Sequence, residues 1–257
     1  MTPKMLMFTT VGAFYFYRIR VGRSIQGFGL SPGITKQQRI DVEALMKNAF
    51  AKMEGDLAGS YYPLTGMDEK VRQQLVDDHF LFMSGDPNLK VAGMERDWPE
   101  GRGIFHNADK TFLVWVNEED QLRIISMQKG GDVKGVFERL ARGIKAVGDS
   151  VKAESGKDFL LSPKFGYIHS CPTNLGTGMR ASVHVDLPGW TKDSIDGLKA
   201  RCEALNLQPR GTRGESGGQT GKQTYLLNTL CQKNIFCPKT VYGLYWPPWP
   251  QIGCHSP

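Results

Sequence analysis

Four side chains of different chemistry are concentrated in one short stretch of the chain. Cys171 opens a turn of small and polar residues that runs to Gly178. The stretch after it alternates strictly, so Arg180, Ser182 and His184 share one face of a predicted strand while apolar residues occupy the other. A guanidinium, a hydroxyl and an imidazole in a row are costly to bury without a ligand. Because a guanidinium pairs well with anions, this face predicts a site for an anionic, ring-bearing partner such as a nucleotide.

Two more arginines, Arg18 and Arg20, share one face of a second predicted strand near the start of the chain. Two guanidinium groups on one face repel unless an anion lies between them, which would make the pair a phosphate clamp. An exposed edge strand with charged outward positions gives the same pattern. On the residue pattern alone, the two interpretations are equally open.

Carboxylates accompany arginines in two further segments. Glu119 precedes Arg123 by four residues in Asn-Glu-Glu-Asp-Gln-Leu-Arg. Such a segment usually forms a polar hairpin tip; the alternative is that Glu119 accepts hydrogen bonds from a guanidinium while Arg123 binds a phosphate. Arg210 and Glu215 border a glycine-rich loop, whose backbone can approach a ligand closely. A lone glycine-rich loop is weak evidence for function.

Together these segments resemble the phosphagen (guanidino) kinases, the family of arginine, creatine and taurocyamine kinases. The most specific segment is Cys-Pro-Thr-Asn-Leu-Gly-Thr from Cys171, and the other segments occur in the family's order. The resemblance implies the α+β class: an antiparallel β-sheet flanked by helices, the guanidino kinase or glutamine synthetase-like catalytic domain. It also implies reversible transfer of the γ-phosphoryl group of ATP to a guanidino nitrogen of arginine or a related small molecule. Mg²⁺ would be held by the phosphates of ATP or ADP, with no protein metal ligands.

The resemblance assigns roles to single residues. Glu119 and Glu215 would grip and orient the planar guanidinium, and one of them could take a proton. Cys171, as a thiolate beside that cation, would add an anionic contact, whereas on its own it could be a small buried residue before a turn. The nucleotide site would consist of Arg18, Arg20, His106 (near the adenine), Arg123, Arg180, Ser182, His184 and Arg210.

Ordinary helix and strand patterns supply the framework that must position these residues. A capping box formed by Thr35 and Gln38 predicts the start of a helix, and Gly130-Gly131-Asp132 and Thr191 open two others. A polar linker is predicted over residues 148–157. The helix that begins at this capping box is predicted over residues 35–53, and another helix over 67–79. Strands are predicted at 17–21, 101–107, 111–116, 121–128, 165–170, 179–187 and 207–212.

Composition narrows the function classes. The 257 residues carry a net charge of +6 without a basic run interleaved with aromatics, so nucleic acid is not an expected partner. No apolar stretch is long enough to span a bilayer, so no membrane association is expected. Five cysteines without regular spacing argue against a disulfide scaffold and favour a reducing compartment, the cytoplasm. The basic, acid-poor start faintly matches a mitochondrial presequence.

The resemblance divides the chain into three expected segments: a divergent start at 1–16, the catalytic domain at 17–225, incomplete at its C-terminal end, and a divergent, poorly ordered tail at 226–257. The helical N-terminal domain of the family is expected to be absent, and Phe16 stands where the family has serine. Two alternatives remain open: a catalytically impaired nucleotide-binding fragment, and a protein-arginine kinase of the bacterial type. The Arg-Gly-Thr-Arg-Gly-Glu segment from Arg210 favours arginine or taurocyamine over creatine as the substrate.

Overall fold

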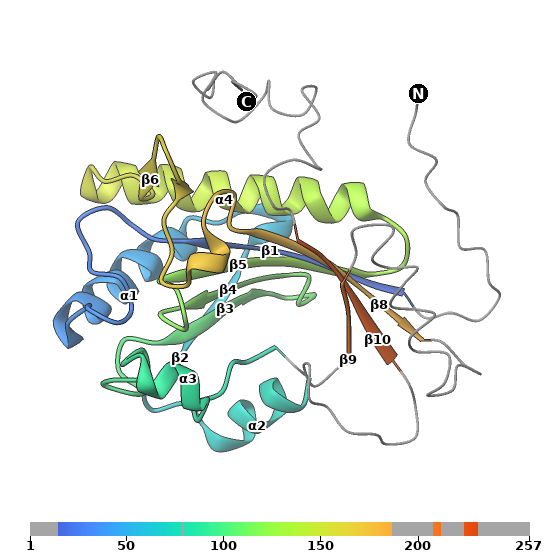
Figure 1. The fold of residues 1–257 in the computed structure, drawn as a ribbon, viewed down its shortest axis with the longest axis horizontal. Helices are drawn as coiled ribbons and strands as arrows, with labels where there is room; N and C mark the ends of the chain where they lie inside the picture. Colours follow the sequence, from blue (N-terminus) through green and yellow to red (C-terminus); the bar gives the residue numbers. More distant parts are fainter. Residues whose placement is uncertain (1–14, 79, 187–207, 212–223, 231–257) are drawn as a thin grey trace, which may run out of the picture.

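The computed structural model describes residues 15–78, 80–186, 208–211 and 224–230. Eight strands form one antiparallel sheet in the order β2-β3-β4-β5-β1-β8-β10-β9, with helices on both faces (Figure 1). The predicted class, an antiparallel sheet flanked by helices, is confirmed. The strands are β1 (Tyr15–Arg23), β2 (Gly59–Pro63), β3 (Gly103–Asn107), β4 (Phe112–Val116), β5 (Leu122–Lys129), β8 (Met179–Asp186), β9 (Gln208–Gly211) and β10 (Thr224–Leu230).

The larger hydrophobic core lies between the sheet and two helices, α1 (Lys36–Ala51) and α4 (Val133–Ser155). The predicted capping box opens α1: the Thr35 hydroxyl accepts from the Gln38 N–H, and the Gln38 side chain accepts from the Thr35 N–H, both at 3.2 Å. Both helices pack on the face of the sheet that carries Ile19 and Val21, α4 over β1 and β5 and α1 over β2 and β4 (Figure 1). Because they cover this face, a ligand must approach the opposite one.

The opposite face of the sheet is apolar at one end and basic at the other. Over β3, β4 and β5, a smaller hydrophobic cluster includes Leu113, Trp115 and Ile125. The helix α2 (Glu69–Asp77), which lies within the predicted helix at 67–79, contributes Leu75 to it. Farther along the sheet, the same face carries arginines in place of apolar side chains. This change of polarity marks the part of the sheet that is suited to a charged ligand.

The predicted linker over residues 148–157 is wrong, because α4 continues through most of it and ends at Ser155. Val147 and Val151 are fully buried one helical turn apart, so the apolar stripe of α4 extends into this polar segment. Gly156 caps the helix, and its φ of +67° is a left-handed conformation that glycine adopts readily. Of the helices in the described ranges, none is long and apolar enough to cross a membrane.

The segment that leads to Cys171 is less regular than predicted. The strand expected over residues 165–170 is reduced to β7 (Gly166–Tyr167), which pairs with β6 (Leu161–Ser162). After β7 the chain leaves the strand and turns inward, so that His169 is buried. The predicted helix that begins at Thr191 lies outside the described residues.

Candidate functional site

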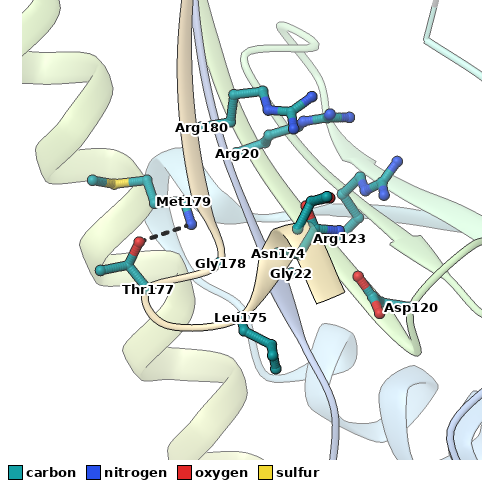
Figure 2. Close-up of a pocket in the computed structure, with 11 residues that line it drawn as sticks. Arg20, Gly22, Asp120, Arg123, Asn174, Leu175, Thr177, Gly178, Met179 and Arg180 are labelled. Carbon is teal, nitrogen blue, oxygen red and sulfur yellow. Dashed lines mark hydrogen bonds between the residues drawn. The ribbon is translucent and has the colours of Figure 1, made fainter. Parts of the chain in front are cut away.

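The register of three neighbouring strands gathers the predicted arginines on one face of the sheet. Arg20 of β1 lies opposite Arg180 of β8, and Arg18 lies opposite Ser182. On the other side of β1, Gly22 is paired with Arg123 of β5. Because side chains two residues apart on a strand point to the same face, these side chains share one surface. Figure 2 shows Arg20 and Arg180 side by side, with Arg123 on the neighbouring strand.

The edge-strand interpretation of Arg18 and Arg20 is wrong. Hydrogen-bonded strands flank β1 on both sides, β5 and β8. The two arginines therefore lie in the interior of the sheet, where a charged side chain needs a partner.

The electrostatics of this arginine cluster are unfavourable in the absence of an anion. Burial, followed by the charges of Arg123, Arg18 and Arg180, lowers the pKa of Arg20 to about 8. Burial, followed by the charge of Arg123, lowers the pKa of Arg18 to about 10. Two nitrogens of Arg18 are buried without a hydrogen-bond partner in the described part of the structure. Because a guanidinium does not lose its proton in proteins, the lowered pKa values express the cost of burial first and of crowded positive charge second, and a bound phosphate chain would offset both.

Arg123 differs from the other arginines because carboxylates surround it. Its Nη1 lies 2.9 Å from Glu118 Oε2, and its Nη2 donates to Glu119 Oε2 at 2.5 Å. Burial lowers the pKa of Arg123, but Glu118, Glu119 and Asp120 outweigh it and leave the pKa above its usual value. Glu119, predicted to hold a substrate guanidinium, therefore holds the guanidinium of Arg123 in this structure.

The loop that begins at Cys171 forms the opposite wall of the site. Cys171 precedes a short 3₁₀ turn, Pro172–Asn174, and is partly exposed, with its Sγ 3.0 Å from Thr173 Oγ1. Residues of this loop line a pocket together with Arg20, Asp120 and Arg123 (Figure 2). The loop that follows the predicted thiol and three of the predicted arginines thus border one depression, whereas Cys171 and Glu119 are not among the residues that line it.

His106 of β3 lies on the same face of the sheet as the arginines, but several strands away from them. The register runs in one row from His106 through Leu113 and Ile125 to Arg20. Three strand spacings separate the two ends of the row, roughly 14 Å. The His106 ring stacks on Tyr62 with a centroid distance of 4.9 Å, which gives an aromatic platform at this end. The distance between platform and arginines is suited to an extended nucleotide, with the base at one end and the phosphates at the other.

The structure says less about three of the predicted site residues, His184, Arg210 and Glu215. His184 of β8 pairs with Leu226 of β10, which in turn pairs with Arg210 of β9, so His184 and Arg210 occupy one row of the sheet. Glu215 lies outside the described residues.

The sequence reasoning missed residues that hold the loop in place. Asp120 Oδ1 accepts a hydrogen bond from the Ser170 N–H at 2.8 Å, although Asp120 is part of the Asn-Glu-Glu-Asp segment that was singled out. Arg23, fully buried, donates from Nη1 to the carbonyl oxygens of Gly22 and Thr177 at 2.6 and 2.9 Å. Arg23 follows Arg18 by five residues, an odd number, so its side chain lies on the opposite face of β1 from the arginine cluster. This spacing could have identified Arg23 as a residue with a different role.

Known proteins resemble this chain over most of its length. The family model for the ATP:guanido phosphotransferase C-terminal catalytic domain matches residues 41–230. An arginine kinase of Anthopleura japonica is 53% identical over 205 residues, which are 80% of this chain and 28% of the relative. An arginine kinase of Limulus polyphemus is 52% identical over 198 residues (77% of this chain, 54% of the relative). A lombricine kinase of Eisenia fetida is 51% identical over 199 residues (77% and 53%).

Solved structures are similar over the same region. A lombricine kinase has a TM-score of 0.78 at 43% identity, covering 86% of this chain and 60% of that chain. The substrate-free duplicated taurocyamine kinase from Schistosoma mansoni has a TM-score of 0.73 at 45% identity, covering 84% and 30%. The chain spans about half the length, or less, of the curated relatives it matches.

Proposed function

Because this chain belongs to the ATP:guanido phosphotransferase family, we propose that it transfers the γ-phosphoryl group of ATP reversibly to a guanidino nitrogen of a small molecule. The observation that carries the proposal is the set of arginines Arg18, Arg20, Arg123 and Arg180, which share one face of three neighbouring strands. Arginine is our first candidate acceptor, since relatives at 53% and 52% identity are named arginine kinases. Lombricine and taurocyamine follow, on the names of the other relatives.

On the donor side, the arginines bind and neutralise the phosphates. Phosphoryl transfer places charge on the oxygens of the moving group, and fixed cations that are already in position stabilise that charge. His106 and its Tyr62 platform bind the base, while Ser182, His184 and Arg210 extend the site on β8 and β9.

Mg²⁺ bound to the phosphates of ATP or ADP would reduce their charge further. The described residues contain no group of three or more His, Cys, Asp or Glu side chains that could hold a metal ion. Their contribution on the donor side is therefore the arginine cluster, which suits a nucleotide that carries its own cation.

On the acceptor side, Glu119, Glu215 and Cys171 surround the guanidinium. The attacking nitrogen forms a bond to the γ-phosphorus while the bond from that phosphorus to the bridging oxygen of ADP breaks, and the nitrogen loses one proton. A carboxylate at Glu119 or Glu215 is the base that takes this proton. To do so, Glu119 must exchange the guanidinium of Arg123 for that of the substrate, which leaves Arg123 to the phosphates and to Glu118.

A second candidate, nucleotide binding without turnover, is favoured by that same pairing. With Glu118 and Glu119 both held by Arg123, the acceptor carboxylate is engaged, whereas two side-chain nitrogens of Arg18 are buried without a hydrogen-bond partner among the described residues. The partly exposed thiol of Cys171 suits a reducing compartment, so we place either function in the cytoplasm.

One assay distinguishes the candidates. ADP release is followed with Mg-ATP and arginine, lombricine, taurocyamine or creatine, and ADP binding is measured by calorimetry. Turnover with at least one guanidino compound supports the kinase. Tight ADP binding without turnover supports the second candidate, and the absence of ADP binding contradicts both. An unfolded protein is included as an acceptor, since phosphorylation of its arginines alone would point to a protein-arginine kinase.

A further inference from the structure

A buried histidine that the proposed chemistry does not use lies directly behind the pocket. His169, two residues before Cys171, is 4% exposed. Its Nδ1 lies 3.0 Å from the carbonyl oxygen of Tyr167. A carbonyl oxygen only accepts, so Nδ1 carries the proton and donates. The ring is therefore fixed at this nitrogen to the end of β7.

The rest of the ring fills a space that two glycines leave open. A Cβ on Gly22 would lie 2.6 Å from the ring, and a Cβ on Gly178 would lie 2.5 Å from it. Gly22 donates its N–H to the carbonyl oxygen of Gly178 at 3.0 Å, so the ring lies against the contact that joins β1 to the end of the cysteine loop. Both glycines line the pocket (Figure 2).

Asp120 approaches the same point from the Asn-Glu-Glu-Asp turn. Its Oδ2 would lie 2.9 Å from a Cβ on Gly22, and His169 Nε2 would lie 2.7 Å from it. Both atoms are buried and without a hydrogen-bond partner in the described ranges. Because Asp120 Oδ1 already accepts from the Ser170 N–H, the residue next to His169 in sequence is tied to this turn.

Three parts of the site therefore meet at His169: the turn that carries Glu119, the end of β1, and the loop that carries Cys171. We propose that His169 is a positioning residue for the phosphoryl transfer. Its ring and its Nδ1–H keep the cysteine loop at a fixed distance from the turn, so that Cys171 and Glu119 face the acceptor together. This inference rests on the proposed function and adds to it a residue that touches neither substrate.

Substitutions can separate the two features of the ring. His169→Phe keeps the ring shape between the glycines but removes the donor to Tyr167. His169→Asn keeps a donor near the Nδ1 position but removes most of the ring. Phe165→Ala is the matched control, because Phe165 lies on the same segment, is 49% exposed and takes no part in the site.

We expect His169→Phe to lower kcat at least tenfold while the KM for Mg-ATP stays within threefold, because Arg18, Arg20 and Arg123 are held by other strands. His169→Asn should recover at least threefold of that loss. The alkylation rate of Cys171 by iodoacetamide, followed by mass spectrometry of its peptide, should change at least threefold in His169→Phe. Phe165→Ala should match the wild-type protein in every measurement.

The proposal is overturned if kcat, KM and Cys171 alkylation in His169→Phe all stay within twofold of wild type. It is also overturned if both His169 variants lose kcat equally, with a lower melting temperature and unchanged Cys171 alkylation, because His169 would then only stabilise the fold. If the wild-type protein shows no turnover, the proposed function fails, yet the alkylation rates still decide whether His169 positions the loop.

Discussion

Arg20 of β1 and Arg180 of β8 lie directly opposite each other, with their guanidinium groups side by side on one face of the sheet (Figure 2). Like charges in directly opposed positions destabilise a strand pair, and burial adds the cost of removing them from water. The protein keeps this arrangement in the interior of its sheet, between well-packed hydrophobic clusters. We therefore interpret this pair of arginines as part of a binding site for an anion.

Removing one of these charges should separate stability from binding. We expect Arg20→Gln to raise the free energy of unfolding of the ligand-free protein by about 0.5–1 kcal/mol, because a repulsion is lost. The same substitution should weaken ADP binding at least tenfold. Chemical denaturation and calorimetry measure the two quantities.

Arg142→Gln is the control for this comparison. Arg142 is half-exposed and pairs with Asp56 on the surface, so its loss should change stability by less than about 0.5 kcal/mol and leave ADP binding unaltered. If Arg20→Gln were less stable than the wild-type protein, the arginines of β1 and β8 would not repel one another in the ligand-free protein.

Anions should stabilise the folded protein selectively. Inorganic phosphate, compared with chloride at equal ionic strength, should raise the melting temperature, because it binds the native arginine cluster and not the unfolded chain. Saturation at a hundredfold excess over the dissociation constant corresponds to about 2.7 kcal/mol. The difference between the melting temperatures in phosphate and in chloride should be smaller for Arg180→Gln than for the wild-type protein. An equal response of both proteins would place the bound phosphate elsewhere.

The two glutamates that hold Arg123 should differ in function. We expect Glu119→Gln to lower kcat roughly 100-fold, the range for loss of a general base, without raising the KM for Mg-ATP, because Glu118 still holds Arg123. Glu118→Gln removes the other ion pair of Arg123 and serves as the matched variant. It should reduce kcat by less than about fivefold on the same scale. Equal losses in both variants would mean that the pairing with Arg123, and not contact with the acceptor, is what matters.

Local patterns predicted the parts of the fold that depend on local order. Strict alternation identified β8, and the capping box identified the start of α1. The pattern could not show that β1 lies in the middle of the sheet, because its partners are far away in the sequence. It also misjudged residues 148–157, where the buried Val151, one turn after the buried Val147, continues the apolar stripe of α4 among charged neighbours.

The sequence predicted which residue types gather at the candidate site better than it predicted the contacts that these residues make. The arginines of β1, β5 and β8 lie together as the segments suggested. The ion pairs of Arg123 with Glu118 and Glu119 depend on the conformation of one turn. The Asp120 contact to Ser170 depends on how this turn meets a distant loop, and spacing along the chain carries no information on such a contact.

The packing of α4 on the sheet gives a test that is independent of the site. A Cβ on Gly143 would lie 2.2 Å from the buried ring of Phe112, so Gly143→Ala should lower the free energy of unfolding by about 1–2 kcal/mol despite the better helix propensity of alanine. Gly131→Ala is the control, since no atom lies within 4 Å of its added Cβ. Denaturation curves compare the two. An unchanged Gly143→Ala protein would contradict the close packing of α4.

The most direct test of phosphoryl transfer is a coupled assay of ADP release by the wild-type protein and by Arg20→Gln, with Mg-ATP and the four guanidino compounds. We predict turnover by the wild-type protein with at least one of the compounds, arginine first, and a loss of at least a hundredfold in kcat/KM for Mg-ATP in Arg20→Gln. The absence of turnover with every compound, or equal activity of the two proteins, would contradict a phosphoryl transfer that depends on the arginine face.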